Sequence, residues 1–303
     1  MTVSKKSGII WATLASVLAA LFVIPWKLAT NAGEITTVVF VLLLSAATAN
    51  SLIWLATSHS KPFAKPTKLE MGLSSGLAVL TLLGNLASAK AIVYLTPASL
   101  NTFFRAEVII ISLLAMVFLK EAIERRFYLG LVVVGVGFYI MTPNHTLGDD
   151  WSVGVGFALI AATMFSGMVL LARKYVRRID TVLVNALRLW ISVIFWFLAN
   201  WRIPGASEFN TSLVLYAVIA AIAGPVLGRM CFMFSSVHLE ARKSALIAMT
   251  SPVFALGFSF IFLDDIPDNL EIWGGAIMLL GISFTLLPKG KFIKLKEIRR
   301  GKV

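Results

Sequence analysis

Long apolar runs, separated by short charged breaks, constrain this chain more than any other feature. A helix that spans a bilayer needs about 20 mostly apolar residues. The breaks carry Lys-Pro, Thr-Pro, Arg-Arg or Asp-Asp pairs. Ten segments between them are of about that length: 8–29, 35–57, 71–94, 97–118, 127–142, 153–173, 181–201, 212–238, 244–263 and 271–287. The sequence therefore predicts an all-α integral membrane protein with ten transmembrane helices.

The composition excludes the soluble classes of protein. Hydrophobic residues make up 58% of the chain and charged residues 14%, whereas soluble domains have about 45–50% and about 25%. One cysteine, Cys231, cannot form an internal disulfide, and the three histidines lack metal-ligand spacing. We expect no metal and no cofactor. The net charge of +12 lies mostly in tracts between spans, so we expect no nucleic-acid partner either.

The basic residues predict the orientation in the membrane, because loops rich in Lys and Arg stay in the cytoplasm. With a cytoplasmic N-terminus and an uncleaved first helix, most of the 27 basic residues fall on the inner side. The outer loops carry mainly acids: Glu34, Asp149, Asp150, Glu208, Asp264, Asp265 and Asp268. We predict that both termini are cytoplasmic and that the chain resides in a bacterial inner membrane, with its basic tail on anionic lipid.

An internal repeat divides the chain into two halves. A shift of 144 residues superimposes the following pairs: Gly84 on Gly228, Glu121 on Asp265, Gly130 on Gly274 and Gly137 on Gly281. Each half holds five helices, and an odd number inserts the second half upside down. Inverted repeats are typical of secondary transporters. We predict two five-helix repeats over 1–147 and 148–288, followed by a basic cytoplasmic tail at 289–303.

Two motifs carry a family resemblance. They are Phe118-Leu-Lys-Glu121…Arg125-Arg126…Gly130…Gly137 and Ser251-Pro-Val-Phe254…Phe262-Leu-Asp-Asp265…Gly274…Gly281. They resemble the two EamA repeats of the drug/metabolite transporter superfamily, over nearly the whole chain. The resemblance implies a central cavity lined mainly by the first, third, fourth, sixth, eighth and ninth helices. Val108 stands where the second repeat has Pro252, so we expect a less bent fourth helix.

Charged residues inside the spans are the candidates for function, because each costs about 2.5–3.5 kcal/mol on insertion scales. Arg105, Glu107 and Arg229 lie near the middle of their spans. Lys27 and Lys90 lie near the outer boundary, where their amines can reach the interface. For Arg188, on a helix that the resemblance places at the periphery, a structural and a functional role both stay open.

The surplus of arginine favours a substrate with a carboxylate or phosphate, which guanidinium groups bind in bidentate fashion. We expect Arg105 and Arg229 to bind it. Glu107 would carry a coupling proton, or form a gate with Arg229. Because helical residues two apart do not face each other, we expect Arg105 and Glu107 to point to different sides. Further candidates for substrate binding are Asn101, Lys90, Asn85, Tyr94, Trp11 and Ser166.

These observations predict a secondary transporter of a small organic metabolite, anionic or zwitterionic, such as an amino acid. A proton gradient or exchange would drive it, and the family resemblance favours export. Motifs for a P-loop, a nucleophile elbow or a zinc protease do not occur, so we expect no enzyme. The alternatives are proton-coupled efflux of cationic drugs through Glu107, a flippase for a lipid-linked substrate, or a membrane enzyme. Substrate, lipid and protons are the expected partners; the oligomeric state stays open, and a monomer is compatible with the sequence.

Overall fold

The computed structural model describes residues 5–57, 66–107, 109–110, 113–114, 125–141, 149–175, 179–201, 204–238, 247, 250–263 and 268–286. The described part is helical and contains no strand. Six of its helices are long and apolar enough to cross a membrane. The elements are α1 (Lys5–Ala32), α2 (Ile35–Thr57), α3 (Lys68–Tyr94), α4 (Pro97–Phe104), α6 (Arg125–Met141), α7 (Asp149–Tyr175), α8 (Thr181–Asn200), η2 (Ala206–Glu208), α9 (Thr211–Ala221), η3 (Ile222–Gly228), α10 (Arg229–His238), α12 (Ser251–Leu263) and α13 (Asn269–Leu286).

Polar residues in the short connections fix where the helices begin. Thr67 and Glu70 form a reciprocal capping box at the start of α3. The side chain of Thr96 caps α4. Pro97 is the first residue of this helix, where its missing N–H group costs no hydrogen bond because the first turn of a helix has no internal acceptor for it. Asp180 caps α8 by accepting from two backbone N–H groups. The predicted break between the third and fourth spans is therefore confirmed.

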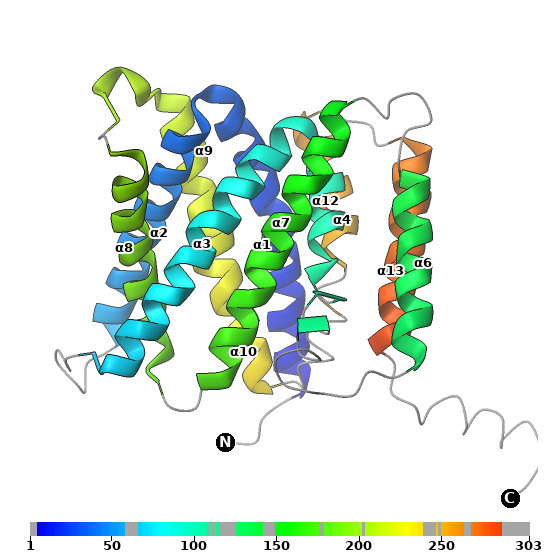
Figure 1. Ribbon diagram of the computed structural model, residues 1–303, viewed down its shortest axis with the longest axis horizontal. Helices are drawn as coiled ribbons and strands as arrows, with labels where there is room; N and C mark the ends of the chain where they lie inside the picture. The colour runs from blue at the N-terminus through cyan, green and yellow to red at the C-terminus, as the bar shows by residue number, and fades with distance from the viewer. Residues whose placement is uncertain are drawn as a thin grey trace, which may run out of the picture.

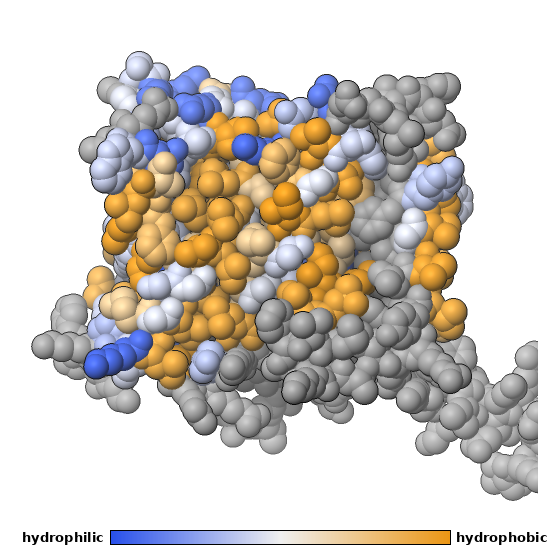
Figure 2. Space-filling view, viewed as in Figure 1, coloured by the Kyte–Doolittle hydropathy of each residue, from blue (hydrophilic) through white to orange (hydrophobic). Residues whose placement is uncertain are grey.

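The side surface of the bundle is largely apolar. Figure 2 shows a broad orange band across the molecule, with bluer residues gathered at its upper edge. Side chains that would be buried in a soluble protein stand largely exposed here: Ile10, Leu52, Val132, Tyr139 and Leu280 are 65–82% accessible. Exposed apolar patches of this extent mark a membrane or protein contact. Together with the six long apolar helices, they support lipid as the solvent of this face.

Helix packing repeats between the two halves of the chain. Helix α3 packs on α7 and α8, and in the same way α9 packs on α1 and α2. Helix α1 packs on α12, as α7 packs on α4. Three further contacts, α2 with α8, α4 with α12 and α6 with α13, join helices at equivalent positions of the two halves. This pattern is what a two-fold exchange of the halves would produce.

Equivalent helices run in opposite directions. In Figure 1, α1 and α3 rise from the lower edge, whereas α7 and α10 descend toward it. Two acids join the halves at opposite ends of the bundle. A carboxylate oxygen of Glu70 accepts from the backbone N–H of Asp180 at 3.0 Å, and one of Glu208 accepts from the hydroxyl of Thr37 at 3.0 Å. The first links the start of α3 to α8, and the second links η2, which precedes α9, to α2.

Two helices change their winding near mid-depth. Helix α4 ends at Phe104, and the N–H groups of Arg105 and Ala106 bond to carbonyls three residues back. The expectation of a less bent fourth helix concerns Val108, which lies outside the described residues; just before it, the chain tightens without proline. Between α9 and α10, the π-helical segment η3 contains Pro225, and the N–H of Arg229 bonds to the carbonyl of Gly224, five residues back. A wider turn leaves room for the proline ring.

Gly228 is required by the π-helical segment. A Cβ atom on Gly228 would lie 2.8 Å from the backbone oxygen of Ala223, and a backbone atom cannot move away cheaply. We expect Gly228→Ala to lower the free energy of unfolding by about 1–3 kcal/mol, the usual cost of overpacking. Thermal unfolding in detergent measures this. The control is Gly156→Ala in α7, where nothing lies within 4 Å of the new atom; an equal loss there would contradict the expectation.

Candidate functional site

A cavity of about 300 Å³ lies in the middle of the bundle. Its lining comes from α1, α3, α4 and the turn that follows it, α7, α8, η3 and α10, with Leu43 from α2. Both halves of the chain thus contribute walls. Small-molecule sites in proteins have about 300–1,000 Å³, so this cavity suits a small solute.

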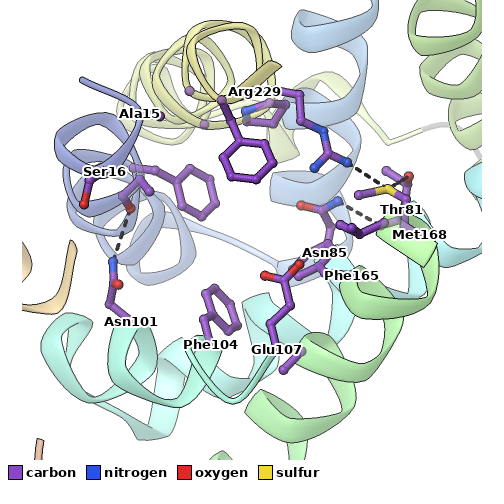
Figure 3. Close-up of a pocket in the computed structure, with 18 of the residues that line it drawn as sticks. Ala15, Ser16, Thr81, Asn85, Asn101, Phe104, Glu107, Phe165, Met168 and Arg229 are labelled. Atoms are coloured by element: carbon purple, nitrogen blue, oxygen red, sulfur yellow. Dashed lines mark hydrogen bonds between the residues drawn. The ribbon is translucent and has the colours of Figure 1, made fainter. Parts of the chain in front are cut away.

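Aromatic rings form much of the wall. Phe22, Phe104, Phe165 and Phe232 line the cavity from four different helices, and Phe104 meets Phe165 edge to face at 5.9 Å. Figure 3 shows Phe104 and Phe165 on the side of Glu107, with Arg229 across the cavity. The walls therefore combine apolar area, which favours an organic moiety, with a few charged groups.

The described lining carries four ionisable side chains: Arg105, Glu107, Arg188 and Arg229. Arginine keeps its charge in proteins. With Glu107 ionised, three positive charges face one negative charge. Burying such a surplus away from water is costly unless a counter-charge is present.

Arg188 and Arg229 converge on one sulfur atom. Nη1 of Arg188 donates to Sδ of Met168 at 2.7 Å, and Nη2 of Arg229 donates to the same atom at 3.1 Å. The hydroxyl of Thr81 also reaches this sulfur, at 3.4 Å, and Nη1 of Arg188 lies 3.4 Å from that hydroxyl. Figure 3 shows the guanidinium group of Arg229 directed at Met168 beside Thr81.

Glu107 lies on the cavity wall opposite these groups. Its carboxylate interacts electrostatically with both Arg105 and Arg229. The hydroxyl of Ser166 donates to the backbone oxygen of Glu107 at 3.2 Å, which ties this part of the chain to α7. Glu107 and Arg229 thus line the same cavity, where their charges act on each other.

Arg105 and Glu107 both line the cavity, contrary to the expectation that they point to different sides. The tightened turn after Phe104 explains this. Residues two apart are about 160° apart around an α-helix but only about 120° apart in a 3₁₀ turn. The local change of winding therefore brings both side chains toward the same space.

Two asparagines of the predicted set line the cavity while their polar groups bond to protein. The amide of Asn101 donates to the backbone oxygen of Ala19 at 3.3 Å and accepts from Ser251 at 2.7 Å. It thereby joins α4 to α1 and α12. Asn85 donates to the carbonyl of Thr81 at 2.8 Å. Both residues fix the wall and present only their remaining polar atoms to a solute.

Four predicted substrate-binding residues lie outside the cavity lining. Lys90 is exposed, with its amine 5.2 Å from the ring centre of Phe157, so it reaches the interface as a long side chain near a span end can. Tyr94 is 42% accessible and lines a separate hollow together with Lys27 and Pro97. Trp11 packs against Phe234 with ring centres 5.3 Å apart. Ser166 touches the site only through the backbone of Glu107.

Sequence reasoning left Arg188 undecided and did not single out Thr81 or Met168. Arg188 is 4% accessible and lines the cavity from α8, a helix that the resemblance placed at the periphery. Helix α8 packs on α2 and α3, and this position directs Arg188 inward. Met168 and Thr81 are residue types common in any apolar helix, so no pattern separated them. Helix α12 contributes no residue to the described lining, but it contacts the site through the Ser251–Asn101 hydrogen bond.

The bundle is closely packed on the side where α1 and α3 end. The cavity lining stops at Phe22 on α1 and at Asn85 on α3. Beyond them, the buried indole of Trp26 donates to the hydroxyl of Ser88 at 3.1 Å. Lys27 donates to carbonyl oxygens at the end of α3, among them Val93 at 3.3 Å and Leu95 at 3.2 Å. This is the anchoring role expected for Lys27, here directed at carbonyls that a helix end leaves free.

Comparison with known proteins identifies the family. The model of the EamA-like transporter family matches residues 6–142 and again 152–287. An uncharacterized transporter of Archaeoglobus fulgidus is 22% identical over 224 residues, which cover 73% of this chain and 70% of that protein. An uncharacterized transporter of Synechocystis sp. is 21% identical over 175 residues, covering 55% of this chain and about half of that protein, 49%.

The fold also matches a solved structure. One protein of known crystal structure aligns with a TM-score of 0.65 at 15% identity, over 99% of this chain and 100% of the other. At that identity the likeness concerns the fold alone. The double match to the family model covers most of the residues and falls once in each half of the chain. The chain therefore belongs to the EamA-like transporter family of the drug/metabolite transporter superfamily, and it is a multi-pass membrane transporter.

Proposed function

We propose that this protein is a secondary active transporter of a small organic metabolite that carries a negative charge, either an anion or a zwitterion such as an amino acid. The observation that carries the proposal is the charge of the cavity: in the described lining, Arg105, Arg188 and Arg229 face one acid, Glu107. Guanidinium groups bind carboxylates and phosphates with paired hydrogen bonds. A cation would meet three like charges in the same space, so efflux of cationic drugs is disfavoured.

The proposed mechanism is alternating access by two inverted halves. The exchange pattern of helix packing and the opposite directions of equivalent helices support it. We propose ten spans, repeats over 1–147 and 148–288, a basic tail at 289–303, both termini in the cytoplasm and residence in a bacterial inner membrane. Close packing around Trp26 and Lys27, beyond the outer end of the cavity lining, is compatible with a cavity closed toward the outside.

Coupling is assigned to Glu107, the one acid in the described cavity lining. It would take up a proton or respond to the exchanged solute, because its charge acts on Arg105 and Arg229. Export rather than import follows from the family resemblance. A gradient or counter-substrate would be the energy source, with no catalytic step.

A metabolite screen by thermal shift, followed by counterflow of each hit in proteoliposomes, tests the proposal. We expect stabilisation and exchange of at least one small carboxylate or phosphate compound. Protection of a pump-deficient strain from cationic drugs, dependent on Glu107 and without any metabolite exchange, would instead support the drug-efflux alternative. Movement of a lipid-linked substrate in the same vesicles would favour a flippase.

A further inference from the structure

We propose that Arg188 and Arg229 form the subsite for a doubly negative group, a pair of carboxylates or a phosphate monoester, and that the cargo replaces the sulfur of Met168 as their acceptor. This inference rests on the proposed transport function and narrows its substrate class from anions and zwitterions to organic dianions. Three observations support it: the convergence of the two guanidinium groups, the weakness of their present acceptor, and the charge of the surrounding cavity.

The geometry brings the two cations close together. Since Nη1 of Arg188 and Nη2 of Arg229 both contact Sδ of Met168, the two nitrogens cannot be farther apart than the two N–S distances together. They come from different helices, α8 and α10. An oxygen in the place of the sulfur would receive a hydrogen bond from each.

The present acceptor is poor for two charged donors. A thioether sulfur accepts hydrogen bonds weakly and bears no charge, so it cannot balance two guanidinium groups. Nε of Arg188 is buried and has no hydrogen-bond partner among the described residues. With a side chain 4% accessible, Arg188 also has little access to water. A buried donor without an acceptor is destabilising, and an anion that supplies oxygens would relieve that cost.

The charges near Arg188 leave it uncompensated. Among the residues that the structure describes, the charge acting on Arg188 is that of Arg229, which repels it. Glu107 acts on Arg105 and Arg229, so its negative charge is already shared between two partners. When Glu107 is ionised, the described lining has a surplus of two positive charges. A ligand with two negative charges neutralises that surplus. A zwitterion carries no net charge and leaves the surplus unchanged.

The hydroxyl of Thr81 completes the subsite. It donates to the carbonyl of Leu77 at 2.7 Å and also lies 3.4 Å from both Sδ of Met168 and Nη1 of Arg188. A hydroxyl can rotate to donate toward an anionic oxygen in the same place. Arg188, Thr81 and Met168 thus become specificity-determining residues beside Arg229.

Ligand-dependent thermal stability of the purified full chain tests the inference. The probes are three dianions, succinate, 2-oxoglutarate and glycerol 3-phosphate, with succinamate as the singly charged match of succinate and glutamine as a zwitterion. We expect at least one dianion to stabilise the protein and, among the dicarboxylates, succinate to bind roughly 10- to 100-fold more tightly than succinamate, the range of one lost charged hydrogen bond. Stabilisation by the dicarboxylates would identify a pair of carboxylates as the bound group. Stabilisation by glycerol 3-phosphate would identify a phosphate monoester.

Substitutions at Met168 give the sharpest readout, because they leave both arginines in place. Met168→Glu supplies an internal carboxylate of similar length, so we expect a higher unfolding midpoint without ligand and no response to dianions. Met168→Leu preserves volume and should retain the dianion response. Arg188→Gln should no longer be stabilised by dianions. If that variant fails to fold, the two Met168 variants still test the inference. Lys90→Gln, which removes an exposed cation away from the cavity, is the control for net charge.

Three results would overturn the inference: no stabilisation by any of the dianions, equal binding of succinate and succinamate, or an unchanged dianion response in Met168→Glu. Counterflow separates this failure from failure of the proposed function. Exchange of glutamine without exchange of any dianion removes the dianion subsite and leaves an anion or zwitterion transporter. Absence of exchange for every carboxylate and phosphate compound in the wider screen would remove the proposed function itself.

Discussion

Replacing Arg229 with Gln is expected to abolish counterflow of the cargo while the protein stays folded. The guanidinium group of Arg229 lines the cavity, contacts the sulfur of Met168 and acts on the charge of Glu107. Leaving a buried anion without one of its charged partners costs about 2–5 kcal/mol. Affinity for an anionic cargo should therefore fall by at least roughly 30-fold.

Folding should survive this substitution, because the wild-type side chain is a partly buried cation with a weak acceptor. Removing such a charge relieves a desolvation cost, so the unfolding midpoint in detergent should stay equal or rise. Counterflow in proteoliposomes and thermal unfolding of the same preparation are the two measurements. Lys90→Gln is the control, because it removes one positive charge, as Arg229→Gln does, but at an exposed position. Transport by Arg229→Gln at the rate of Lys90→Gln would remove Arg229 from the site.

Replacing Glu107 with Gln is expected to remove gradient-driven accumulation while exchange continues. Gln keeps the size of the side chain but cannot gain or lose a proton near neutral pH. Each pH unit of gradient supplies about 1.4 kcal/mol per coupled proton, enough for roughly tenfold accumulation of cargo. Without the titrating group, the accumulation ratio should lose this factor, whereas binding of an anion should be kept or strengthened.

The measurement compares accumulation under an imposed pH gradient with counterflow at equal pH, in vesicles of the same protein content. The variant should differ from the wild type in the first assay alone. Equal accumulation by both proteins would show that the proton does not travel on Glu107. Loss of both activities with an intact unfolding transition would instead make Glu107 part of the binding wall rather than the coupling group.

Much of the fold follows from the order of apolar and charged residues. Predicted spans such as 35–57 agree with the helices within a few residues, because lipid forces each apolar run to satisfy its own backbone. The end of α3 and the start of α4 were predictable from Thr96 and Pro97. The change of winding at Arg105 and the π-helical segment before Arg229 were not, since neither depends on hydrophobic pattern.

The candidate site was predictable where charge was rare. Arg105, Glu107 and Arg229 stand out because ionisable residues are expensive inside a membrane, and all three line the cavity. Lys90 and Tyr94 lie outside the described lining. Their depth in the span suits either role, and the direction of each side chain depends on the neighbouring helices. Arg188 was underrated because its sequence position gave no sign that α8 turns this residue inward.

The order of residues alone determined that the chain is a helical membrane protein with repeated halves, because solvation of the backbone by lipid and insertion of charges act on each segment separately. Only the tertiary structure decided which charges share a space. The meeting of Arg188 and Arg229 at the sulfur of Met168 joins three helices of the second half, α8, α10 and α7. Such a meeting depends on helix rotation and local winding, which packing between helices sets and no single segment encodes.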